Sequence, residues 1–479
     1  MVHAANVGCS DYPPPGFHTV VSLWNALATQ PSGLDLAGSP LPERMSEFTR
    51  LIRDIEISSG TIPFALNRRT PPLFPNLRRL TWVVQINASI QPFRYFVVPS
   101  LKELRVNAES NGDSAQDVLF RTTLFNAVHP IAHNCVWMTS VEILWKGPFL
   151  PVPHSVLDLL RPLVHLQSLF ISTNLFASRW SLYSLSKLPA LRDLKIQHLE
   201  RTELKGMVLV SPEDSGFPAL QTFWIDGPST AVCFFLPLMP PCNVRYCTVT
   251  EQDMPSGDVQ HKIVETVANQ FGPALSTLEL HFPSGKFRLP PQTGTLFYIR
   301  FSVDLLPLLC QLRTLTEVRL GKLEPCELTD ALCEQMAAAW PHLRVVQFSS
   351  SRPVENPLPS MVTLHGLRHF AERCSGLEDI MIQVNAAGSH WAAEANKFAP
   401  VRRTALSVCL DLTTSLVTYP QTVAVYLKQC FHAFSDVRFM GKGEAETAGQ
   451  GAKVEAWKVL CRLLLQGGAL EEALRRLEE

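Results

Sequence analysis

The chain has 479 residues, of which 46% are hydrophobic and 18% are charged, and its formal net charge is -1 at pH 7. Because about 25% of the residues of an average soluble protein are charged, this chain has an apolar excess that can build a large core. No run of five like charges occurs, which argues against nucleic acid or an anionic membrane surface as a partner.

Residues 1–44 are predicted to form an N-terminal arm. The opening MVHAANVGCSDYPPPG has no basic start followed by an apolar block, so we expect no secretory signal and a cytoplasmic or nuclear location. Its prolines and the polar stretch from Gln30 to Glu43 favour an arm that caps the first repeat or hangs free. Ala231–Met239, a later apolar stretch broken by Pro237, is shorter than the roughly 20 residues of a membrane-spanning helix.

A short apolar pattern recurs through residues 45–440. Its unit is an apolar residue, two residues of any kind, a second apolar residue, one of any kind and a third apolar residue, which is the strand signature of leucine-rich repeats. The clearest copies are Leu77/Leu80/Trp82, Leu101/Leu104/Val106, Leu166/Leu169/Ile171, Leu191/Leu194/Ile196, Leu220/Phe223/Ile225, Leu275/Leu278/Leu280, Leu315/Val318/Leu320, Leu343/Val346/Phe348 and Leu377/Ile380/Ile382. Weaker copies start at Ile52, Met138, Val244, Ala405 and Phe434, which makes about fourteen units.

Prolines and helical stripes complete each unit. A proline stands two residues before the first anchor at Pro75, Pro99, Pro189, Pro218, Pro273 and Pro341. Because proline cannot continue a helix, each of them predicts a helix-to-strand junction. Apolar residues at helical spacing predict helices at Val259–Phe271, at Leu332–Trp340 with Thr329 as its cap, and at Leu364–Ala371.

These patterns predict an α/β leucine-rich-repeat solenoid. We expect an irregular horseshoe with parallel strands on the concave face and helices on the convex face, sharing one continuous core. Residues 441–479 are predicted to form a loop, Gly441–Lys453, followed by capping helices at Val454–Leu465 and Leu470–Leu477.

The sequence contains no recognisable catalytic or cofactor motif. Gly441–Lys453 lacks the Gly-Lys-Ser/Thr ending of a phosphate-binding loop. His365 and His369 are four residues apart, but no acidic base accompanies them as in a zinc protease. The twelve cysteines are scattered without zinc-site spacing, and we expect them to be reduced and mostly buried. We therefore expect a protein that is not an enzyme, with no cofactor and no metal.

The residues between the strand anchors are predicted to point out of the concave face, because side chains alternate along a strand. The predicted partner-binding residues on this face are Arg79, Arg105, Phe170, Lys195, Trp224, Tyr246, Glu279 and Arg319. Phe170, Trp224 and Tyr246 come from nearly successive units and are predicted to form an aromatic patch, since aromatic residues carry much of the energy of interfaces. The alternative is that these rings pack beneath a neighbouring loop or the C-terminal segment.

Two segments resemble the helix-turn-strand units of F-box leucine-rich-repeat proteins. They are TLHGLRHFAERCSGLEDIMI, residues 363–382, and LTDALCEQMAAAWPHLRVVQF, residues 328–348. In the first of them, Cys374 matches the cysteine position of that family's repeats, three residues before Leu377. FPNLRRLTW and VPSLKELRV are similar to the fungal F-box-like group. The resemblance covers roughly Met45 to Phe439.

The resemblance implies an F-box, a three-helix module that precedes the repeats and docks on a Skp-type adaptor of a cullin ubiquitin ligase. Val20–Gln30, VVSLWNALATQ, looks like the last helix of that module, whereas Pro13, Pro14 and Pro15 argue against helices upstream. We therefore expect the F-box to be truncated or missing.

The resemblance favours the substrate-recognition subunit of such a ligase, or a relative that has lost adaptor docking, with an unknown protein substrate as partner. The alternative is a leucine-rich-repeat scaffold unconnected to ubiquitin. An enzyme regulator such as a GTPase-activating repeat protein would need a concave arginine or asparagine constellation, which the sequence does not identify.

Overall fold

The computed structural model describes residues 49–58, 74–85, 96–109, 129–146, 160–172, 184–197, 216–252, 257–281, 287–288, 296–297, 303–321, 328–349, 360–398, 407–411, 416–431, 433–438 and 450–465. They belong to two compact units, Met1–Asn243 and Val244–Glu479. The predicted arm with its Val20–Gln30 helix, the weak anchor Ala405 and the predicted helix Leu470–Leu477 lie outside the described residues.

The first unit is built on parallel strands that follow one another in chain order. They are β1 (Asp54–Ser58), β2 (Arg79–Gln85), β3 (Glu103–Glu109), β4 (Ser140–Lys146), β5 (Ser168–Ser172), β6 (Asp193–Gln197) and β7 (Thr222–Gly227). After β7 come the helix α5 (Ser229–Phe235) and the 3-10 turn η7 (Leu236–Leu238). Each predicted strand pattern of this unit therefore becomes one strand of the sheet.

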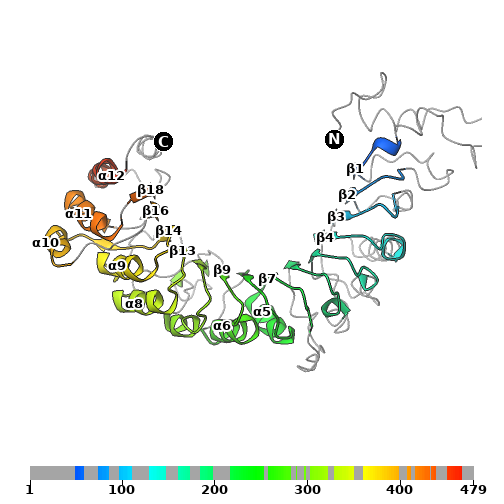
Figure 1. Cartoon of the computed structure of the whole chain (residues 1–479), viewed down its shortest axis with the longest axis horizontal. Helices are drawn as coiled ribbons and strands as arrows, with labels where there is room; N and C mark the ends of the chain where they lie inside the picture. Colours follow the sequence, from blue (N-terminus) through cyan, green and yellow to red (C-terminus); the bar gives the residue numbers. More distant parts are fainter. Residues whose placement is uncertain are drawn as a thin grey trace, which may run out of the picture. The chain divides into compact units, whose positions relative to one another are not determined.

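The second unit repeats this plan, with helices between several of its strands. Its parallel strands are β8 (Tyr246–Glu251), β9 (Thr277–His281), β12 (Glu317–Gly321), β13 (Val345–Ser349), β14 (Asp379–Met381), β16 (Ser407–Asp411) and β18 (Ala433–Arg438). Its helices are α6 (Gly257–Phe271), η8 (Val303–Leu305), α7 (Leu306–Leu309), α8 (Asp330–Ala339), α9 (Leu364–Arg373), α10 (Trp391–Asn396), α11 (Pro420–Cys430) and α12 (Gln450–Leu464). Figure 1 shows α6, α8 and α9 on one face of these strands.

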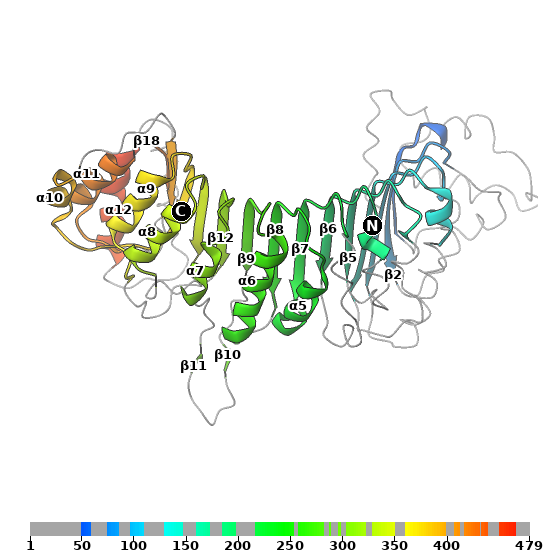
Figure 2. The same cartoon turned by 60° about the horizontal axis from the view of Figure 1, so that its bottom comes forward.

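Two small strand pairs accompany the second unit. β10 (Phe287–Arg288) and β11 (Leu296–Phe297) pair antiparallel, and Figure 2 shows them beyond the ends of β9 and β12. β15 (Asn385–Ala386) and β17 (Leu416–Val417) pair in parallel. The C-terminal helix α12 begins at Gln450, so it includes the last residues of the segment that the sequence predicts as a loop.

A β-turn precedes several of the strands, and it explains the proline pattern. The amide of Leu77 donates to the carbonyl of Phe74 at 3.1 Å, and that of Leu343 donates to the carbonyl of Trp340 at 3.1 Å. Pro75 and Pro341 therefore occupy the second position of a four-residue turn, which suits the fixed φ of proline. Phe74 and Trp340, the residues before these two prolines, are buried in the core.

In most repeats, a single carbonyl after the turn accepts two amides of the next repeat. The amides of Lys102 and Glu103 both donate to the carbonyl of Arg78, at 2.8 and 2.9 Å. In the second unit, Arg344 is such an acceptor, and it receives the amides of Glu378 and Asp379 at 2.7 and 3.0 Å. These shared acceptors fix the register of neighbouring strands.

The predicted anchors form the core, together with apolar stripes of the helices. All three anchors of every strong copy are buried, as are those of the weaker copies that start at Met138 and Val244. The Thr329 hydroxyl caps α8 by accepting from the amide of Leu332 at 3.3 Å. The chain is thus an α/β leucine-rich-repeat solenoid, as the sequence predicts.

Candidate functional site

The open face of each unit is the side of the strands that points away from the buried anchors. Strand register aligns its residues into rows across the repeats. One row of the first unit runs from β2 to β7 through Thr81, Arg105, Glu142, Phe170, Lys195 and Trp224. Four of the predicted partner-binding residues therefore lie in a single row.

The basic residues at the start of the first unit are paired with carboxylates. Arg79 contacts Glu103 on the next strand at 2.6 Å. Arg105 contacts Glu142 on the next strand at 2.6 Å. Both arginine side chains are more than half exposed, and exposed ion pairs of this kind contribute only up to about 1 kcal/mol. These two ion pairs therefore determine the local charge pattern of the face and add little to the stability of the fold.

Phe170, Lys195 and Trp224 form a cluster at the other end of this row. The ring centroids of Phe170 and Trp224 are 5.9 Å apart with an interplanar angle of 86°, an edge-to-face contact that aromatic pairs favour. The two strands that carry them flank β6, so the rings reach toward one another beside Lys195. The Lys195 Nζ lies 5.9 Å from the centre of the Phe170 ring, within the range of a cation–π interaction.

The cluster is accessible. Lys195 is exposed, whereas Phe170 and Trp224 are partly buried. Among the described residues, the ring contact of Phe170 is the one with Trp224, and the ammonium of Lys195 has no ion pair. Tyr246, the third predicted ring, is the first residue of β8 in the second unit, where it aligns with Thr277 and is 50% exposed.

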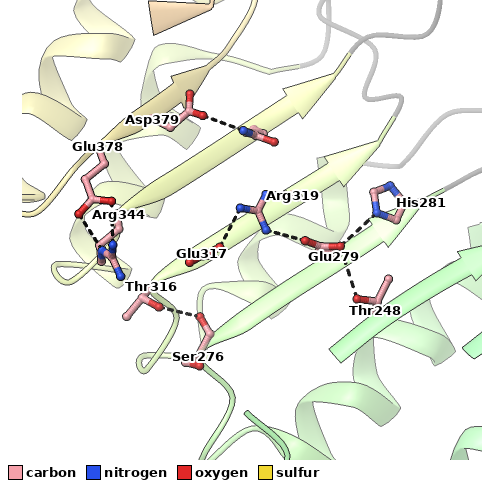
Figure 3. A network of polar contacts seen from close by, with 11 residues as sticks. Thr248, Ser276, Glu279, His281, Thr316, Glu317, Arg319, Arg344, Glu378 and Asp379 are labelled. Carbon is pink, nitrogen blue, oxygen red and sulfur yellow. Dashed lines mark hydrogen bonds and ion pairs between the residues drawn. The ribbon is translucent and has the colours of Figure 1, made fainter. Parts of the chain in front are cut away.

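The second unit carries a polar network on its open face, drawn in Figure 3. Arg319 on β12 donates to Glu279 on β9 at 2.5 Å and contacts Glu317 on its own strand at 2.8 Å. Glu279 also accepts from Thr248 and lies within hydrogen-bond distance of His281, each at 3.4 Å. The predicted contact residues Glu279 and Arg319 are therefore engaged with one another.

These contacts change the acidity of Glu279. The hydrogen bond with His281 makes the largest contribution, and the hydrogen bond and charge of Arg319 act in the same direction. Together they lower the pKa of the carboxyl from 4.5 to about 2, although partial burial acts to raise it. Glu279 therefore stays ionised under all ordinary conditions. A carboxylate that is already satisfied in this way offers less to a partner than an unpaired one.

Further polar ties continue along the second unit. Gln347 on β13 donates to Asp379 on β14 at 2.9 Å. Arg344 and Glu378, in the turns before these strands, form a two-point contact at 2.8 and 3.0 Å (Figure 3). Each tie joins one repeat to the next, so this network supports the stack.

The His365 and Cys135 side chains are placed for packing. His365 Nδ1 lies 2.8 Å from the Tyr426 hydroxyl, and the rings of Trp391 and Phe398 also contact the imidazole. Burial raises the pKa of the Cys135 thiol to about 12, which disfavours the nucleophilic thiolate. No group of three or more His, Cys, Asp or Glu among the described residues could hold a metal ion.

Two cysteines occupy equivalent positions in different repeats, which the sequence pattern did not show. Cys374 Sγ donates to the Trp340 carbonyl at 3.4 Å, and Cys135 Sγ donates to the Val98 carbonyl at 3.1 Å. Each thiol lies three residues before its anchor and reaches the preceding repeat. Glu142 was likewise missed as an open-face residue, because its repeat begins at the weak anchor Met138.

The chain matches solved structures, but it matches no family model and no curated protein. Among the matching solved structures is the crystal structure of a TLR13–ssRNA13 complex, with 12% identity and a TM-score of 0.28. That alignment covers 82% of this chain and 62% of the other. The fold assignment rests on the strand order and the repeated turn described above.

Within the described parts of the chain, no helix is long and apolar enough to cross a membrane. A leucine-rich-repeat solenoid presents an extended surface of strands, and such solenoids typically serve as binding scaffolds.

Proposed function

We propose that this chain is a non-catalytic scaffold that binds a protein partner on the open face of its first unit. The Phe170–Lys195–Trp224 cluster is the observation that carries the proposal. It combines two partly buried rings with an accessible cation, and aromatic residues are enriched among the side chains that dominate interface energies. The predicted contacts Arg79 and Arg105 lie on the same face and would contact the partner beside the cluster.

The remaining predicted contacts are Tyr246, Glu279 and Arg319 in the second unit. Tyr246 has an accessible ring, whereas Glu279 and Arg319 bind one another. We therefore assign the main contribution to the cluster and a secondary one to Tyr246.

The test is to compare partner capture by the wild-type chain and by Phe170→Ala/Trp224→Ala, followed by affinity measurements with the purified captured protein. Loss of two interface rings should raise the dissociation constant by about 30-fold or more. A matched control is Trp137→Ala/Phe234→Ala, which removes the same two residue types from exposed positions of the same unit. Equal affinity of all three proteins would refute this site.

We propose further that the chain is the substrate-recognition subunit of a Skp–cullin ubiquitin ligase, or a relative of such subunits that has lost adaptor docking. In either case we propose that it acts in the cytoplasm or nucleus. The support is the resemblance to F-box leucine-rich-repeat proteins, carried by the unit in which Cys374 bonds to the Trp340 carbonyl. Co-purification of the full-length chain with a Skp-type adaptor tests it. Reproducible absence of the adaptor from a complex that retains the partner favours a scaffold unconnected to ubiquitin.

A further inference from the structure

Lys195 differs from the other predicted cations of the first unit. Arg79 and Arg105 each have a carboxylate at 2.6 Å. The ammonium of Lys195 is exposed, and within the described part of the chain it contacts only the face of the Phe170 ring. Asp193 lies two residues earlier on the same strand, yet it forms no ion pair with Lys195. The positive charge is therefore available to a partner.

The two rings allow Lys195 to form a stronger ion pair with a partner than an isolated surface lysine could form. Register places Lys195 directly between Phe170 and Trp224. A partner that covers the rings excludes water from the lysine, and an ion pair strengthens as the surrounding dielectric constant falls. The same partner would bury apolar surface against the two rings.

We propose that the Phe170–Lys195–Trp224 cluster recognises an acidic–apolar segment of the partner protein, in which an Asp or Glu carboxylate pairs with Lys195 and a neighbouring large apolar side chain packs on the two rings. This inference rests on the proposed function of the same face. It adds the chemical class of the segment that is bound.

The surroundings favour a carboxylate over a phosphorylated side chain. Phosphorylated segments are generally bound by clusters of arginines. Here the nearest arginine in the row, Arg105, is held by Glu142, and Glu142 aligns with Phe170. Asp193 adds a second negative charge on the Lys195 strand. Asp193 would repel a doubly charged phosphate more strongly than a singly charged carboxylate.

The experiment is selection of short random peptides, displayed on phage, against the full-length chain. Selected peptides are expected to combine Asp or Glu with a nearby aromatic or large aliphatic residue. Lys195→Gln should weaken their binding by about three- to tenfold. Lys102→Gln, which neutralises another exposed lysine of the same unit, should leave binding unchanged. A separate selection on Lys195→Glu should favour basic residues in place of acidic ones.

The outcomes separate this inference from the proposed function. Peptides that need Phe170 and Trp224, lack acidic residues and bind Lys195→Gln equally well would overturn the acidic specificity and leave the binding face intact. Peptides that bind Phe170→Ala/Trp224→Ala as well as the wild-type chain would overturn both. Because Lys195 is exposed, unchanged thermal unfolding of its variants excludes misfolding as the cause of a lost signal.

Discussion

The thiol of Cys374 donates to the carbonyl of Trp340 across the boundary between two repeats, at 3.4 Å. This carbonyl belongs to the residue before Pro341, and the same atom accepts from the amide of Leu343 in its own turn. The thiol therefore fixes the preceding turn while it fills the core. Cys135 does the same to Val98 in the first unit.

We expect Cys374→Ala to lower the free energy of unfolding by about 1–3 kcal/mol, because it removes a buried donor and leaves a small cavity. Cys374→Ser keeps a donor and should lose less. Chemical denaturation followed by circular dichroism measures both. The control is Cys310→Ala, at a partly exposed position, which should change stability by under about 0.5 kcal/mol. A loss for Cys310→Ala as large as that for Cys374→Ala would contradict the proposed role of the thiol.

The turn before β14 offers a stabilising substitution. Cys374, Ser375, Gly376 and Leu377 form the same turn as the proline-containing ones, with the Leu377 amide 3.2 Å from the Cys374 carbonyl. Cys374 has φ −102° and ψ 83°, close to the −121° and 67° of Trp340 before Pro341.

Ser375→Pro should therefore raise stability by about 0.4–1 kcal/mol, because it restricts the unfolded chain without straining the turn. Thermal unfolding checks the sign. Gly376→Pro places the ring at the next position, which disfavours the turn, and should destabilise. A destabilising Ser375→Pro would show that the two turns are not equivalent.

Glu279 gives the stability of the second unit a pH dependence. Its pKa is lowered from 4.5 to about 2, so its contribution is fully present above about pH 4.5 and is lost as the pH falls toward about 2. Glu279→Gln should cost about 1–2 kcal/mol near neutral pH, after allowance for the partial exposure of the pair.

The difference between the wild-type chain and Glu279→Gln should shrink as the pH falls through this window, in denaturation curves recorded at several pH values. Glu265→Gln, at an exposed position on α6 in the same unit, should show no such trend. A difference that is constant from neutral pH down to pH about 2 would exclude the carboxylate as its source.

Two ion pairs of similar length should differ in energy because their exposure differs. The Arg319 and Glu279 side chains are 30% and 25% exposed, whereas Arg79 and Glu103 are 54% and 45% exposed. Double-mutant cycles to alanine should give a coupling energy of about 1 kcal/mol for the first pair and under about 0.5 kcal/mol for the second. The reverse order would mean that exposure does not control these pairs.

The sequence predicted the strands of the repeats well, because each of them needs three apolar anchors at fixed spacing and these residues can be recognised in the sequence. Leu77, Leu80 and Trp82 are all buried, as predicted. The helix stripes of α6 and α9 and the Thr329 cap were also predicted, since they depend on local spacing alone.

The contacts between repeats could not be predicted in the same way. The Arg105–Glu142 pair joins residues 37 positions apart, and the irregular repeat length hides which positions align. The contact between Arg319 and Glu279, 40 positions apart, was missed for the same reason. Phe170, Lys195 and Trp224 were each predicted to face outward, but the contact of the two rings beside Lys195 emerged only from the structure.

The shared carbonyl acceptor in each turn has a consequence for how such a chain can change. These carbonyl links involve only the turn and the first residues of the strand. They leave the length of the intervening segment unspecified, and 24 residues separate Leu77 from Leu101 whereas 40 separate Leu275 from Leu315. Insertions and deletions between strands can therefore be accommodated without displacing the open face.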